Sequence, residues 1–145
     1  MYSLAKELAG RMRSIIAIES EIAEAEAQQR GEQVVLGLER QRSKLINSCT
    51  RDELLVIKTV MNVGLRERGY RHYFDSDEIE IITLPIELNE HELMQKYSYY
   101  LIHKTERELA DRIEYYTAVS EQLREGMQIL KLHPADKSGS RRFTR

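Results

Sequence analysis

The chain contains no tryptophan, only two phenylalanines and a single cysteine among its 145 residues. So few large apolar side chains argue against a thick globular core, and each of the eight tyrosines carries a hydroxyl that needs a partner. Cys49 cannot form an intramolecular disulfide, and we expect it to be a small buried or loop side chain. These shortages favour amphipathic helices over a thick globular core.

Long apolar runs are also missing from the sequence. No run approaches the roughly 18 residues that a helix needs to span a bilayer. The N-terminal stretch is amphipathic and carries Glu7, so it lacks the apolar core of a signal peptide. We therefore expect a cytoplasmic protein that does not enter a membrane.

No pattern in the sequence is typical of a catalytic or cofactor site. The seven glycines are scattered, so no glycine-rich loop precedes a helix to hold a phosphate. No serine nucleophile motif is present. No histidine stands at a metal-binding spacing; the four are His72, His91, His103 and His133. We expect no enzymatic activity, no metal and no cofactor.

Apolar residues at steps of three and four are what the chain has in abundance, and they predict a mainly α protein. Gly31 is the expected break between the first two helices, which gives an αα-hairpin; one bent helix of over 40 residues is the alternative. Thr50 and Glu53 form a capping box before the most apolar segment, which we place at the centre of the core. The predicted helices span residues 3–30, 32–47, 51–68 and 90–132.

The last predicted helix leaves one question open. Asn89 and Glu92 form a capping box at its start, but the signature recurs at Thr105–Glu108 and no apolar residue lies between Ile102 and Leu109. One helix over 90–132 and a helix broken near 103–105 both fit. Together these helices make a single domain over residues 1–133, followed by a basic C-terminal tail over 134–145.

Residues 70–83, "YRHYFDSDEIEIIT", interrupt the helical pattern with two short alternating runs. They predict a small β-hairpin whose three-residue loop pairs His72 with Glu80. A lone hairpin is marginal in water, so this one must lean on the helices or on another chain. The expected fold is thus an antiparallel long-helix bundle with coiled-coil-like hairpins and one β-hairpin insert.

Charge and tyrosines suggest where a partner binds. Residues 75–92 hold seven acids and no lysine or arginine, directly after a basic stretch, and such opposite runs can pair within or between chains. Tyr97, Tyr100 and Tyr116 fall on the apolar stripe and are expected in the core. Tyrosines off that stripe can anchor interfaces. The predicted partner-binding residues are Tyr73, Asp75, Asp77, Glu78, Glu80, Tyr99 and Tyr115.

The favoured function is a non-enzymatic protein-protein interaction protein, either a homo-oligomer or a small structural or regulatory subunit of a larger assembly. The alternative is a helical nucleic-acid-binding regulator that uses the 70–83 hairpin as a wing. Its phosphate contacts would be Arg66, Arg68, Arg71, Arg141 and Arg142. The acidic tip of the hairpin argues against it, because a wing needs cations there.

Overall fold

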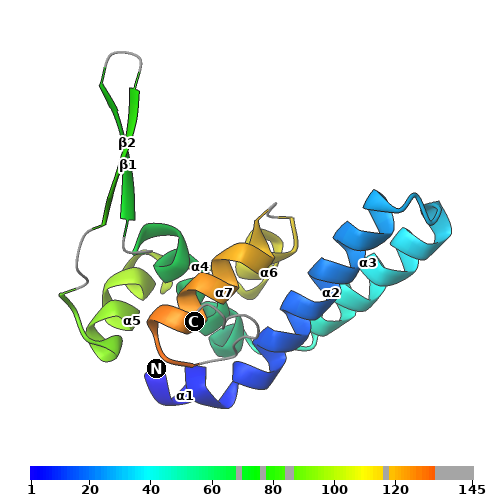
Figure 1. Ribbon diagram of the computed structural model, residues 1–145. Coiled ribbons are helices and arrows are strands. Elements are labelled where there is room, and N and C mark those ends of the chain that lie inside the picture. The colour runs from blue at the N-terminus through cyan, green and yellow to red at the C-terminus, as the bar shows by residue number, and fades with distance from the viewer. Residues whose placement is uncertain (68–69, 76–77, 84–86, 116–117, 133–145) are drawn as a thin grey trace.

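The protein is mainly helical, as the sequence predicts. The computed structural model describes residues 1–67, 70–75, 78–83, 87–115 and 118–132, and of the two strands it describes the backbone. A compact group of helices surrounds α4, a pair of helices extends to one side, and a β-hairpin stands away from the helices (Figure 1). Within the described residues no helix is long and apolar enough to cross a bilayer. The predicted tail, residues 134–145, lies outside the described residues.

Helix α4, Arg51–Arg66, forms the centre of the core. The predicted capping box begins it: the Glu53 backbone N–H donates to Thr50 Oγ1 at 3.2 Å, and the Thr50 N–H donates to Glu53 Oε1 at 2.9 Å. Every residue from Leu54 to Met61 is buried, so the helix is covered on all sides. Its neighbours are α1 (Tyr2–Glu7), α5 (Glu90–Ser98), α6 (Glu106–Glu114) and α7 (Val119–Ile129). The prediction that this segment lies at the core is confirmed.

Two glycines set the distance between α4 and α7, the most extensively packed pair of helices. A Cβ atom on Gly64 of α4 would overlap the carbonyl oxygen of Gln122 in α7. A Cβ atom on Gly126 of α7 would overlap the carbonyl oxygen of Val60 in α4. Each helix thus presents a glycine to the backbone of the other. On each helix this glycine lies four residues from the carbonyl group that the other helix's glycine faces. This crossing is closer than side chains would allow.

The N-terminal helix is not continuous over 3–30. Residue Leu8 separates α1 from α2, Ala9–Ala27, and it is itself buried. The break lets α1 pack against α4 and α5 while α2 packs against α7 and α3. The Tyr2 hydroxyl fixes α1 by donating to the Leu130 carbonyl oxygen at 2.6 Å. The apolar stripe runs through this bend without a change of period, so the stripe alone did not reveal it.

Helix α3 spans Glu32–Asn47, and the turn before it contains Gly31 at φ 107°. That conformation is open to glycine and strained for other residues, which is why the chain reverses here. The predicted αα-hairpin is therefore present, and the alternative of one bent helix is wrong.

The 90–132 segment is divided more finely than either prediction. It forms α5, a 3-10 turn over Tyr99–Leu101, α6 and α7. The break near 103–105 is confirmed: a capping box joins Thr105 to Glu108, and Arg51 donates to the backbone carbonyl oxygens of Ile102 and Lys104. A second break separates α6, which ends at Glu114, from α7, which begins at Val119. No glycine or proline lies there to announce it.

Strands β1, Tyr70–Asp75, and β2, Glu78–Thr83, pair antiparallel between α4 and α5. Their register differs by one residue from the expected one: His72 pairs with Ile81, and Glu80 pairs with Tyr73. The prediction had three residues between the strands, but only two separate them. A two-residue loop is the commonest hairpin connection. Because one step changes every cross-strand pair, the predicted pairing of His72 with Glu80 is wrong.

The glycine crossing predicts a sharp stability difference between substitutions. We expect Gly126→Ala to cost about 3 kcal/mol of unfolding free energy or more, because the added methyl must push two backbones apart. Gly10→Ala in α2 is the matched control, since its Cβ would meet only the flexible Arg13 guanidinium at 3.7 Å. The control should be neutral or up to about 1 kcal/mol more stable. Urea denaturation measures both, and equal stability of the two variants would contradict the close crossing.

Candidate interaction surface

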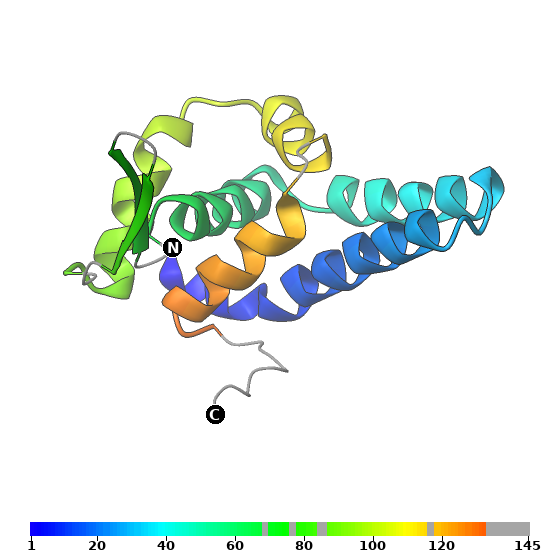
Figure 2. The ribbon, with the colours of Figure 1, turned by 45° about the horizontal axis from the view of Figure 1, so that its top comes forward.

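Helices α2 and α3, with the turn between them, form an arm that extends from the rest of the molecule (Figure 2). The inner part of α2 belongs to the core, where Met12 and Ile15 are fully buried. Toward the tip, burial declines, and only Ile22 and Ala25 of α2 remain buried. Helix α3 buries a single residue of its 16, Ile46 at its inner end. The outer arm therefore has little core of its own.

An ion pair joins the two helices of the arm midway along its length. Arg42 Nη1 of α3 donates to Glu19 Oε2 of α2 at 2.9 Å. The two side chains are only 14% and 15% exposed, so the pair is largely shielded from water. Arg124 of α7 adds a hydrogen bond to Ser20 at 3.1 Å, which connects the arm to the helical group. Polar contacts thus help to hold α2 and α3 together where few apolar side chains are buried.

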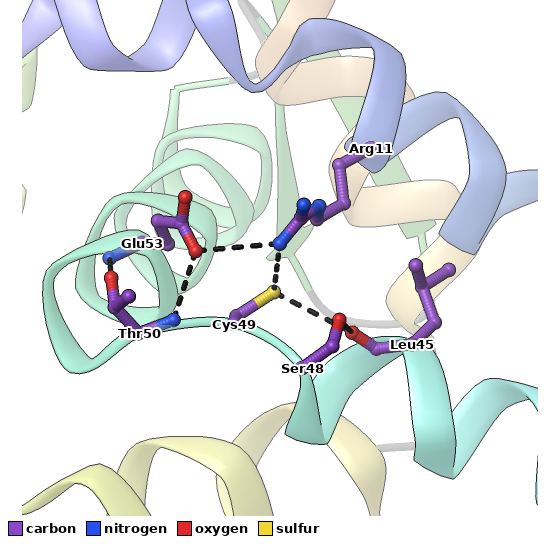
Figure 3. A network of polar contacts seen from close by, with 6 residues as sticks. All are labelled: Arg11, Leu45, Ser48, Cys49, Thr50 and Glu53. Carbon is purple, nitrogen blue, oxygen red and sulfur yellow. Dashed lines mark hydrogen bonds and ion pairs between the residues drawn. The ribbon is translucent and has the colours of Figure 1, made fainter.

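The root of the arm is held by a small polar network where α3 passes into α4 (Figure 3). Arg11 reaches from α2 and places one guanidinium nitrogen, Nη1, 3.4 Å from Cys49 Sγ and 3.3 Å from Glu53 Oε1. The same Glu53 oxygen accepts from the Thr50 backbone N–H, and so it belongs to the α4 capping box as well. One arginine thereby connects α2, the α3–α4 connection and the start of α4.

Cys49 is a structural member of this network. Burial raises the pKa of its thiol, and the hydrogen bond from Arg11 opposes that effect without reversing it. The protonated thiol is a poor nucleophile at neutral pH. A hollow of about 300 Å³ adjoins it, lined by Asn47, Cys49, Leu54, Glu106, Arg107 and Ala110. Within the described residues no three His, Cys, Asp or Glu side chains gather to hold a metal ion.

Helix α3 exposes apolar and charged side chains that sequence reasoning did not select. No residue of the outer apolar segment, "VVLGL" over 34–38, is fully buried, and Val34 and Leu36 are 36% and 38% exposed. Leu36 lies in a row with Glu32 and Arg40, each four residues from the next and each exposed. The sequence does contain a sign of this exposure. The helical pattern over 32–46 is weak, and the apolar run over 34–38 holds more apolar residues than one face of a helix can bury.

The hairpin residues predicted to bind a partner lie on the two strands. Tyr73 and Asp75 are in β1, and Glu78 and Glu80 are in β2, where the structure describes the backbone. Asp77 lies outside the described residues. Their role in binding stays a prediction.

The tyrosines are distributed differently from the prediction. Tyr99 and Tyr115, predicted to lie off the core stripe, are 65% and 73% exposed. Tyr100 was expected in the core and is 81% exposed, because the 3-10 turn rotates it away from the stripe that a continuous α-helix would have continued. It packs instead on Tyr99, edge to face, with ring centroids 5.1 Å apart. Tyr116 lies outside the described residues.

The basic residues of the nucleic-acid alternative do not form a described cluster. Arg66 is exposed at the end of α4, and Arg71 lies in β1. Arg68, Arg141 and Arg142 lie outside the described residues. Helix α4, which precedes the hairpin and would have to serve as a recognition helix, is covered by other helices and cannot enter a major groove.

Comparison with protein-family models, with curated proteins and with solved structures gives no match for the chain.

The shielded ion pair of the arm predicts a local loss of stability. We expect Glu19→Gln to cost about 1–3 kcal/mol of unfolding free energy, because Arg42 then keeps its charge in a largely dry site without a charged partner. Glu21→Gln, two residues further on the exposed side of α2, is the control and should be nearly neutral. Hydrogen exchange should accelerate in α2 and α3 for the first variant only. Identical exchange in both variants would show that the pair does not hold the arm together.

Proposed function

We propose that the protein acts without catalysis, as a protein-protein interaction protein of the cytoplasm, and that the outer part of the arm is its contact surface. In this role it is a homo-oligomer or a small structural or regulatory subunit of a larger assembly. The observation that carries the proposal is the outer apolar segment, 34–38, in which no side chain is fully buried although the segment contains four aliphatic residues.

The energetics of the arm support this role. Two helices with so few buried residues gain little from packing on each other, and short helices are marginal in water by themselves. Exposed aliphatic side chains at the end of an extended element lose unfavourable contact with water when a partner covers them. A partner helix laid along α3 would therefore stabilise the arm and complete its packing. Tyr99 and Tyr115 remain candidates for further contacts, since both are largely exposed.

The test is contact mapping in the native host. A photo-reactive amino acid placed at Val34 should form covalent adducts with a protein, because that side chain is exposed within the proposed surface. The same amino acid at Gln128, an exposed position of α7, is the matched control and should give far fewer adducts.

The mass of the adduct identifies the kind of partner. An adduct of two chains, each of 17.0 kDa, indicates self-association, and any other mass indicates a different protein. Equal adduct yields at the two positions would refute the arm as the contact surface.

A further inference from the structure

We propose that the arm binds a second copy of this chain, with the two α3 helices packed antiparallel about a two-fold axis at Leu36 and Gly37. This inference deepens the proposed function by naming the partner of the same surface. It rests on three features of α3: the row that contains Leu36, the charges at both ends of that row, and the glycine beside it.

The row consists of Glu32, Leu36 and Arg40. Residues four apart lie on one face of a helix, and all three side chains are exposed. Glu32 and Arg40 are about 12 Å apart along the helix axis, which is too far for them to pair with each other. Neither side chain takes part in an ion pair within the part of the chain that the structure describes. The row therefore has an apolar centre, an unpaired acid at one end and an unpaired base at the other.

Such a row is complementary to itself when it is reversed. In an antiparallel pair centred on Leu36, the two leucines meet at the axis, and Glu32 of each copy faces Arg40 of the other. Two equivalent ion pairs then flank one apolar contact, as an isologous interface requires. A parallel pair would instead place like charges opposite each other at both ends, which disfavours it.

Gly37 explains how closely the two helices can approach. It lies inside α3, where glycine costs about 1 kcal/mol of helix stability relative to alanine. Among the described residues, no atom beyond its own stretch of helix lies within 4 Å of the position that its Cβ would occupy, so none of their packing requires a glycine there. At Gly64 and Gly126, by contrast, the backbone of a neighbouring helix occupies the space where a Cβ atom would lie. An open glycine next to Leu36 is what a second helix would need in order to pack equally closely.

Charge exchange tests the arrangement directly. Sedimentation equilibrium of the purified chain at micromolar concentration and low salt should give twice the 17.0 kDa monomer mass. Glu32→Arg and Arg40→Glu, each alone, should weaken the dimer about tenfold or more, because both ion pairs become repulsive contacts. The double variant restores both pairs in reversed polarity and should recover the affinity. An equimolar mixture of the two single variants should form the heterodimer.

A steric variant provides an independent readout. Gly37→Gln should make the helix of the monomer more stable, because glutamine is a better helix former, yet it should weaken the dimer by blocking the close approach. Glu24→Arg is the charge control: this carboxylate is exposed on α2, off the row, and its reversal should leave the dimer unchanged.

A monomer at all concentrations, or single reversals that the double variant does not rescue, would overturn the α3–α3 pairing. The proposed function survives that result if the photo-reactive residue at Val34 captures a different protein in preference to the control position. Failure of both experiments removes the arm as an interaction surface altogether.

Discussion

The contact between the backbones of α4 and α7 at Gly64 and Gly126 is the constraint on which the other packing depends. It fixes how close the two central helices lie, and α1, α5 and α6 pack around α4 at positions that this spacing leaves open. A close crossing also concentrates the large aliphatic residues of the chain in one place, with Ile57, Met61 and Leu123 fully buried there. The outer arm buries few side chains of its own, so the aliphatic residues over 34–38 of α3 are only partly covered.

Local chemistry made much of the fold predictable. Each of the three capping boxes is recognisable from two residues three positions apart, such as Thr50 and Glu53. All three form in the structure. The helix breaks at Leu8 and between α6 and α7 were not predictable in this way, because tertiary packing imposes them on a continuous apolar pattern. The glycine crossing has the same origin: Gly64 and Gly126 are distant in sequence, and only the fold reveals that they face the same contact.

The candidate site was less predictable than the fold. Sequence reasoning favoured the hairpin and the tyrosines, because acids and aromatic rings are conspicuous in a sequence. The row of Glu32, Leu36 and Arg40 lies in a segment whose helical pattern resembles an ordinary half-buried helix. Its exposure depends on how little of α2 covers α3, and that is a property of the assembled arm. Tyr100 illustrates the reverse case, a side chain whose burial was inferred from a helix that ends two residues before it, at Ser98.

The root of the arm is built differently on its two sides. Helix α2 runs unbroken from the core into the arm, whereas α3 ends at Asn47 and a short connection leads to α4. A continuous helix resists bending, and a connection of a few residues absorbs dihedral changes easily. The two connections of the arm to the core therefore differ: the short α3–α4 connection can bend, and Arg11 of α2 contacts it at Cys49 and Glu53. A load applied at the tip would be shared between these Arg11 contacts, the packing of α2 on α7 and the packing of α3 on α6.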